Sequence, residues 1–380
     1  MIEPKITITS EENNTLYFTL SNTPTCLANS LRRIILSEIP TVVFRTFPHS
    51  ESKVDIITNT SRFNNEILKQ RIGCIPIHIN DSEFPIEEYS IELDVKNDSD
   101  STILVTTKDF KIKNISTDKY ISESTVRNIF PSDPITNDFI PICRLRPKLS
   151  DNLEGEQLTL SATLDYGNAK HDGMYNVVST CSYGATIDKV QANDKWYNIQ
   201  KELEKKGLSK EEIEFEKDNW FLLDGKRITI PNSYDFVIES IGVFTNFDIV
   251  YKACDIIIKK CKLLMSLLEK VDNEPDSKIK IEINENTTIS NEFIITLKDQ
   301  DYTIGNALVY FLYEDYYIKD NSLSFVGFKV PHPHIPNGVI RMAFNTSETQ
   351  TTVVQYLNIS CQKVIETFKK IQNNFTQLDV

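Results

Sequence analysis

Two histidines in this sequence are spaced so that they could bind a metal ion together. His332 and His334 stand in VPHPHIPNG, and an H-x-H spacing can offer two imidazoles to a metal ion. No third ligand lies nearby in the sequence. His171 and Asp172, in KHDGMYN, could form a general-base pair, but such a pair needs a nucleophile. The sequence has no G-x-S-x-G, P-loop or G-x-G-x-x-G motif, so it predicts no catalytic residues.

Cysteine is the other residue type with a possible role in metal binding. Seven cysteines are scattered along the chain, and Cys74, Cys143 and Cys181 are far apart with no C-x-x-C pair. The pattern therefore predicts no metal and no cofactor. An odd number of cysteines within apolar runs indicates a reducing, intracellular compartment. Cys254 and Cys261 are interpreted as small buried hydrophobic residues of a helix.

Composition limits the class of partner. The chain has 380 residues, enough for two or three domains, and a formal net charge of −13. Nucleic-acid affinity depends largely on lysine and arginine, so direct sequence-specific contact with nucleic acid is not expected. The start MIEPKITITS has neither a charged n-region nor an apolar h-region, and no stretch approaches 18 apolar residues, so we expect no signal peptide and no contact with a membrane.

The sequence contains an internal repeat of a strand followed by a helix, and these elements would position any site. LYFTL at 16–20 and EFIITL at 292–297 alternate like half-buried strands and are related by a shift of 277 positions. An amphipathic helix follows each strand, with a cap expected from Thr25 or Thr23 in the first copy and from Thr303 in the second. Pro40 should end the first helix. The apolar residues predicted to face the core are Leu27, Leu31, Ile34 and Ile35 in the first helix and Ile304, Leu308 and Phe311 in the second.

Each copy also has a long helix whose apolar residues are spaced alternately three and four apart. Such a stripe is typical of a helix that packs along another helix. The stripes include Val250, Cys254, Ile257, Cys261 and Leu264 in one helix, and Leu357, Cys361, Val364 and Phe368 in the other. The linker between the copies, 271–277, has seven residues and spans at most about 25 Å when extended, so it would keep the copies together. We therefore predict an intramolecular pseudo-dimer, the alternative being two independent amphipathic helices on separate sheets.

Several blocks of the sequence resemble a known family. NSLRRIILSEIPT at 29–41 and NTSRFNNEILKQRIGCIPI at 59–77 resemble the alpha-like assembly subunit of multisubunit RNA polymerases, such as the third subunit of eukaryotic RNA polymerase II and archaeal D. LEGEQLTLSATLDYG at 153–167 and YDFVIESIGVFTNFDIVYKACDII at 234–257 are similar to its later blocks. FIITLKDQDYTIGNALVYFLYED and VGFKVPHPHIPNGVIRMAF, in 293–344, resemble the smaller partner, the eleventh subunit or archaeal L.

The chain thus resembles both subunits fused in order. Fused forms of this pair are a feature of large DNA viruses, and a composition rich in Asn and Ile is compatible with such a source. The resemblance does not extend to 80–150 or 185–230, and the latter includes two short charged helices expected around Gly207. Location would be nuclear, or cytoplasmic in a viral factory or virion.

The resemblance implies an α+β fold. A first dimerisation domain would comprise 1–47 and 176–271, interrupted by an inserted β-rich domain at 48–175, and 278–380 would form a second, smaller dimerisation domain. The function implied is that of a non-catalytic platform on which the largest and second-largest polymerase subunits assemble within a heteromultimeric complex. A small zinc-binding polymerase subunit is a further implied partner.

The resemblance also implies site residues. The large-subunit interface would be formed by polar residues of the first two blocks, namely Asn29, Arg32, Arg33, Glu38, Glu66 and Arg71. His332 and His334 would belong to a rigid contact loop. Two alternatives remain: an acidic hydrolase or transferase that uses His171 and nearby carboxylates, and a dimeric adaptor outside transcription.

Overall fold

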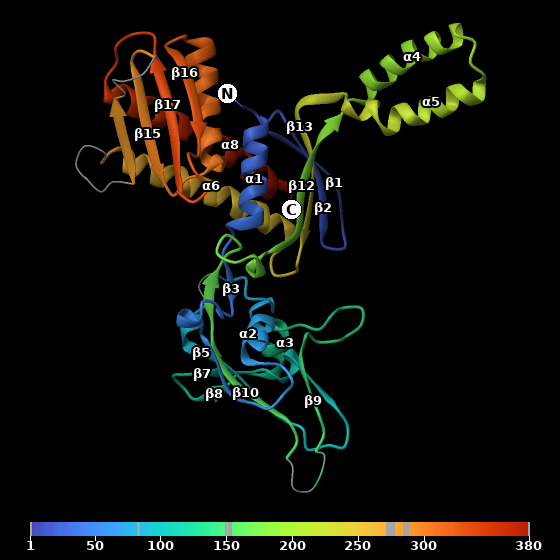
Figure 1. The fold of residues 1–380 in the computed structure, drawn as a ribbon, viewed down its shortest axis with the longest axis vertical. Helices are drawn as coiled ribbons and strands as arrows, with labels where there is room; N and C mark the ends of the chain where they lie inside the picture. The colour runs from blue at the N-terminus through green and yellow to red at the C-terminus, as the bar shows by residue number, and fades with distance from the viewer. Residues whose placement is uncertain are drawn as a thin grey trace. The chain divides into compact units, whose positions relative to one another are not determined.

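The structure, a computed structural model, describes residues 2–81, 84–148, 150, 154–270, 278–283 and 289–378. Helices and antiparallel sheets occur together, which confirms the predicted α+β class. The chain divides into two compact units (Figure 1), of which unit 1 comprises Met1–Ile35, Thr180–Glu239 and Asn246–Val380, and unit 2 comprises Leu36–Ser179 and Ser240–Thr245. The predicted linker, 271–277, lies outside the described residues.

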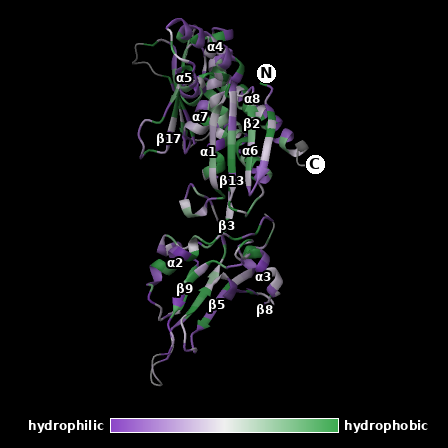
Figure 2. Cartoon of the chain, turned by 90° about the vertical axis from the view of Figure 1, so that its right-hand side faces the viewer, coloured by the Kyte–Doolittle hydropathy of each residue, from purple (hydrophilic) through white to green (hydrophobic). Residues whose placement is uncertain are grey.

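The first copy of the repeat is built on a four-stranded antiparallel sheet in the order β1-β2-β13-β12. Hydrophobic residues recur along β2 and β13 (Figure 2), because alternate residues of both strands face the core. The elements are β1 (Lys5–Glu12), β2 (Thr15–Ser21), α1 (Thr25–Ser37), β12 (Val178–Ile187), α4 (Lys189–Lys205), α5 (Lys210–Leu222), a 3-10 turn (Asp224–Arg227), β13 (Thr229–Ser240) and α6 (Asn246–Leu268).

The second copy repeats this plan on a sheet in the order β14-β15-β17-β16. The shift of 277 positions places β2 on β15 residue for residue and the first residue of α1 on the first residue of α7, as the sequence predicts. Its elements are β14 (Ile279–Ile283), β15 (Glu292–Lys298), α7 (Tyr302–Leu312), a π-helix (Tyr313–Lys319), β16 (Leu323–Lys329), β17 (Asn337–Phe344) and α8 (Gln350–Leu378).

The two long helices α6 and α8 pack along each other within unit 1. The end of α8 reaches the first copy, where the Phe375 ring lies 5.1 Å from that of Phe18 in β2 and 6.0 Å from that of Phe247 in α6. The end of α6 in turn lies with Ile279 and Leu297 of the second sheet around a small cavity. Each helix therefore extends from its own copy onto the other, as in an isologous dimer interface.

All the apolar residues that the sequence assigned to the dimerisation core are buried. These residues are Leu27, Leu31, Ile34, Ile35, Val250, Cys254, Ile257, Cys261, Leu264, Ile304, Leu308, Phe311, Leu357, Cys361, Val364 and Phe368. Helices α6, α7 and α8 belong to unit 1, as does α1 as far as Ile35. The copies differ where these helices end: α1 ends before Pro40, whereas α7 continues as a π-helix, a rare form whose backbone bonds span five residues.

Unit 2 has its own hydrophobic core around a five-stranded sheet in the order β4-β10-β5-β7-β8. Two further pairs, β11-β3 and β6-β9, complete it. The predicted inserted domain, 48–175, lies within this unit. Its elements are β3 (Thr41–Val43), β4 (Val54–Asn59), α2 (Asn65–Gly73), β5 (Tyr89–Lys96), β6 (Ile103–Thr106), β7 (Lys111–Asn114), β8 (Lys119–Tyr120), α3 (Glu123–Ile129), β9 (Pro141–Leu145), β10 (Gln157–Thr163), β11 (Asp165–Gly167) and four 3-10 turns (His49–Glu51, Ile86–Glu88, Thr107–Asp109 and Gly173–Tyr175).

Two charged helices, α4 and α5, form a hairpin between strands β12 and β13 of unit 1 (Figure 1). They turn at Gly207, whose φ of +79° favours glycine, as the sequence predicts. Among the described residues, no helix has the length and hydropathy needed to cross a membrane.

Candidate functional site

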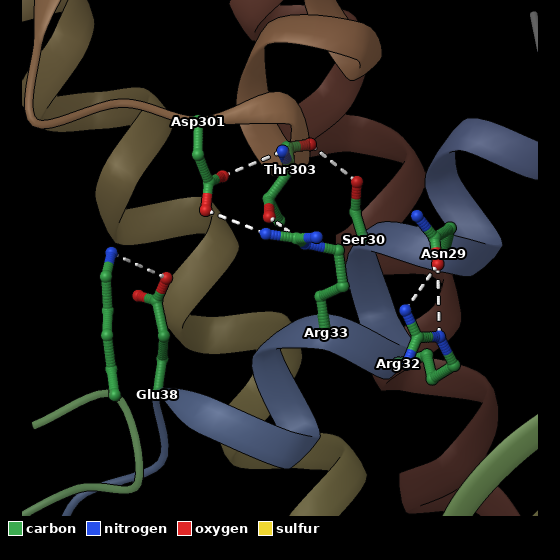
Figure 3. Close-up of polar contacts among 8 residues, drawn as sticks. Asn29, Ser30, Arg32, Arg33, Glu38, Asp301 and Thr303 are labelled. Atoms are coloured by element: carbon green, nitrogen blue, oxygen red, sulfur yellow. Dashed lines mark hydrogen bonds and ion pairs between the residues drawn. The ribbon is translucent and has the colours of Figure 1, made fainter. Parts of the chain in front are cut away.

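The N-terminus of α7 is joined to α1 by a polar network that links the two copies (Figure 3). Ser30 Oγ donates a hydrogen bond of 2.6 Å to the Thr303 carbonyl, and Arg33 Nε donates one of 2.8 Å to Thr303 Oγ1. Arg33 Nη2 lies 2.9 Å from Asp301 Oδ2 in an ion pair. Asp301 and Thr303 thus hold the Arg33 side chain across the boundary between the copies, and the Ser30 hydroxyl adds a further hydrogen bond across it.

Asp301 also caps α7. Its side chain accepts a hydrogen bond of 2.8 Å from the Thr303 amide, one of the donors left unpaired at a helix start. The prediction that Thr303 caps this helix is therefore wrong, because Thr303 is inside the helix and its hydroxyl instead accepts from Arg33. Burial alone would raise the pKa of Asp301, but the hydrogen bonds from Thr303 and the Arg33 charge together lower it below its ordinary value.

The two adjacent arginines of α1 have different surroundings. Arg32 donates through Nε and Nη2 to Asn29 Oδ1, at 3.0 and 2.8 Å, so both partners are on the same helix. Arg33 instead reaches the second copy, and 39% of its side chain stays exposed. The resemblance assigns both arginines to the interface, but the structure gives Arg33 a contact inside the chain.

Glu38 lies just after α1 and forms a long ion pair with Lys170, 3.5 Å between Oε1 and Nζ, within unit 2. Only 10% of the Glu38 side chain is exposed. Little of this carboxylate is therefore accessible to another protein, although the resemblance assigns Glu38 to an interface.

Helix α2 carries the other two predicted interface residues. Asn64 caps the helix by accepting from the Ile67 amide, and Glu66 is exposed in the first turn, where its charge complements the helix dipole. Arg71, in the last turn, donates to the Pro141 and Ile142 carbonyls at 2.7 and 2.8 Å and so ties α2 to β9. Arg71 thus has a structural role in unit 2 in addition to any external contact.

Helix α2 ends at Gly73, although the Gly73 backbone is not left-handed. A Cβ at Gly73 would lie 2.7 Å from Thr46 Oγ1 and 2.8 Å from Met174 Sδ. Glycine is therefore required here by the close approach of the neighbouring segments.

His332 and His334 are exposed in the loop between β16 and β17. Their rings meet edge to face with centroids 5.1 Å apart, and the His334 amide donates to His332 Nδ1 at 3.1 Å. This hydrogen bond occupies one imidazole nitrogen. In the part of the chain that the structure describes, no group of three or more His, Cys, Asp and Glu residues has the geometry to hold a metal ion.

His171 and Asp172 line a hollow of unit 2 together with Arg45, Lys53 and Asp165. Asp172 caps a short 3-10 turn by accepting from the Met174 amide, and Asp165 pairs with both Arg45 and Lys53. Among the described residues that line this hollow there is no serine, threonine or cysteine to act as a nucleophile. The arrangement therefore offers no support for the hydrolase alternative.

Ser30 and Asp301 complete the contact between the copies and are not among the residues predicted from the sequence. One local signal was present: aspartate two residues before Thr303, at the start of an apolar helical pattern, is a preferred N-cap. The cross-copy contact itself has no local signal, because its partners are far apart in the sequence.

Each copy of the repeat matches a known family of domains. Residues 17–261 match the RNA polymerase Rpb3/Rpb11 dimerisation domain, and residues 292–374 match a second form of that domain. The first match alone spans more than half of the chain.

Full-length polymerase subunits are also similar. The Dictyostelium discoideum protein "DNA-directed RNA polymerases I and III subunit rpac1" is 28% identical over 71% of this chain and 83% of its own length. The Schizosaccharomyces pombe "DNA-directed RNA polymerase II subunit RPB3" is 24% identical over 76% of this chain and 95% of its own length. The Pyrococcus furiosus "DNA-directed RNA polymerase subunit Rpo3" is 24% identical over 70% of this chain and 98% of its own length. With two matching domains in one polypeptide, this chain belongs to the Rpb3/Rpb11 dimerisation-domain family of RNA polymerase subunits.

Proposed function

We infer that this chain is a non-catalytic assembly subunit of a heteromultimeric DNA-directed RNA polymerase. The observation that carries this inference is the packing of α6 on α8, which joins two dimerisation domains of the same family in one polypeptide. The family resemblance implies that in related polymerases the two domains belong to separate subunits. One chain would here replace the pair, as expected for a fused gene such as those of large DNA viruses.

The proposed role is to bring together the largest and second-largest subunits, which would hold the catalytic residues. Arg32 is the favoured contact for the second-largest subunit, because its planar guanidinium is pre-oriented by Asn29 and can bind carboxylates or carbonyls. Glu66 on α2 is the favoured contact on unit 2, since it is exposed. Arg33, Glu38 and Arg71 would act mainly by shaping these surfaces, because each has partners within the chain.

Further parts of the proposal rest on the family resemblance. The domains would be 1–47 with 176–271, 48–175 and 278–380. The loop with His332 and His334, together with the inserted domain, would meet smaller subunits, including a zinc-binding one. The chain would work in the nucleus or the cytoplasm.

Co-expression with the two large subunits tests the function. Tagged chain should co-purify with both, and a preparation that captures neither would contradict the assembly role. Arg32→Glu should weaken capture of the second-largest subunit at least tenfold, because breaking a buried charge pair costs about 2–5 kcal/mol. Arg227→Glu, the same change at an exposed arginine elsewhere in unit 1, is the matched control. Equal capture by both variants would rule out Arg32 as the contact but leave the assembly role intact.

The dimeric adaptor outside transcription makes a different prediction in the same experiment. Such an adaptor would be purified from its native cells with proteins other than polymerase subunits. Identification of the co-purified chains by mass spectrometry distinguishes the two functions.

A further inference from the structure

The outer face of α5 carries an alternating acidic and apolar stripe. Glu211, Phe215, Asp218 and Leu222 follow one another at spacings of four, three and four residues, which places them on one side of the helix. All four are exposed, Phe215 by 66% and Leu222 by 62%, and the adjacent Leu223 is 64% exposed. Apolar side chains that are exposed together on one side of a helix are a common mark of a protein–protein interaction site.

The inner face of the hairpin already has its packing partners. Trp196 of α4 is buried and lies near Phe221, with ring centroids 6.4 Å apart. Trp220 Nε1 donates to the Ala192 carbonyl at 3.3 Å, and Gly225 packs closely against Trp220. Ser209 and Glu212 form a reciprocal capping box at the start of α5. The stripe is therefore presented by a helix that is fixed from its other side.

The charge around the stripe specifies what it would bind. Glu211 is one turn before Phe215, and Asp218 lies between Phe215 and Leu222. A partner that buries the two apolar side chains must place groups beside both carboxylates, and lysine or arginine would satisfy them. Acidic partners would be repelled, and nucleic acid would bring its phosphates against the same carboxylates.

We propose that the α5 stripe (Glu211, Phe215, Asp218 and Leu222) docks a helix of another protein on which lysine or arginine alternates with apolar residues at one-turn spacing. From Glu211 to Leu222 the stripe is about 16 Å long, so three turns of a partner helix would cover it. Such pairing follows the ridge-packing mode of two helices, with Phe215 and Leu222 as anchors. This docking is a function beyond assembly of the large subunits and does not depend on it.

Site-specific photo-cross-linking tests the proposal in the full chain, purified with its native complex from the cells that make it. Phe215 is replaced with the photoreactive residue benzoylphenylalanine, and the control carries the same residue at Lys195, an exposed position off the stripe on α4. The expected product joins position 215 to a segment of a different protein in which basic and apolar residues alternate at helical spacing. Raising the salt concentration, or adding Glu211→Lys and Asp218→Lys, should reduce its yield at least tenfold.

Other outcomes contradict the proposal. A yield at position 215 no higher than at position 195 would show that nothing is bound at the stripe. Cross-links to a second copy of this chain, to nucleic acid or to an acidic segment would show a different occupant. Because every substituted side chain is exposed, circular dichroism and the thermal midpoint should be unchanged, which separates loss of docking from loss of folding.

Discussion

Arg33 and Asp301 form an ion pair 2.9 Å long although 268 residues separate them in the sequence. The arginine belongs to the first copy of the repeat and the aspartate caps the equivalent helix of the second. Thr303, hydrogen-bonded to both, completes a small network across the boundary. The contact between the copies thus has a polar part at α1 and α7 as well as the apolar part formed by α6 and α8.

A double-mutant cycle should detect this contact. We expect Asp301→Ala to lower the free energy of unfolding by about 1 kcal/mol through loss of the helix cap. The coupling energy between Asp301→Ala and Arg33→Ala should be less than about 1 kcal/mol, because both side chains are partly exposed. Urea denaturation measures both values. The control cycle combines Asp301→Ala with Arg32→Ala, whose effects should add. Equal coupling in both cycles would contradict the ion pair.

Acid should weaken the same contact. Because the folded-state pKa of Asp301 is lowered, its stabilising contribution is present above the unfolded-state value of about 4 and is lost as the pH falls through the folded-state value. Between pH 5 and pH 2 the urea midpoint of the wild-type chain should therefore fall further than that of Asp301→Asn. Parallel curves for the two proteins would show that Asp301 does not contribute.

Cleavage of the chain between its copies should leave them associated. A protease site inserted within 271–277 should yield two fragments that co-elute in size-exclusion chromatography, because α6 and α8 remain packed. Val364→Asp places a charge in this buried contact and should separate the fragments. Ile359→Asp, on the exposed side of the same helix, is the control and should not. Fragments of the wild-type sequence that elute separately would refute the pseudo-dimer.

Gly73→Ala should destabilise unit 2. The new methyl group would overlap Thr46 and Met174, at a cost of about 1–3 kcal/mol in the free energy of unfolding. Gly173→Ala is a matched change in the same unit, since no atom lies within 4 Å of its added Cβ, and it should have little effect. Thermal denaturation of the two variants makes the comparison. A Gly73→Ala protein as stable as Gly173→Ala would show that the neighbours move aside without cost.

Alkylation should distinguish the cysteines by burial. Cys74 is exposed, whereas burial raises the pKa of Cys26 and Cys143 to about 11 and that of Cys181 to about 12. Iodoacetamide at pH 8 should therefore modify Cys74 first, because the thiolate is the reactive form. Peptide mass spectrometry over time gives the order. Early modification of Cys181 would mean that its surroundings open readily.

The elements of the dimerisation core could be predicted from the sequence because their signals are local and repeated. The alternation in LYFTL and the three-and-four spacing through Cys254 and Cys361 each arise within one element. Their burial follows, since an apolar stripe of this length must be covered. The second copy supplied an independent instance of the same pattern, which strengthened each assignment.

Unit 2 and the polar contacts were harder to predict. Strands β6 and β7 have only four residues each, too few to establish a period, and β6 pairs with β9, which is separated from it along the chain by β7, β8 and α3. Arg33 could not be distinguished from Arg32, because adjacent charges on a helix look alike until the fold brings Asp301 to one of them. The residue types indicated which polar side chains could form contacts. Their partners could not be predicted, because the fold brings them from distant segments of the chain.

Both copies of the dimerisation domain are carried by one polypeptide, which has a consequence for synthesis. Each translation event yields the two halves in equal number, so neither is ever made in excess and left with an uncovered apolar helix. The cell therefore does not need to balance the amounts of two separately expressed proteins.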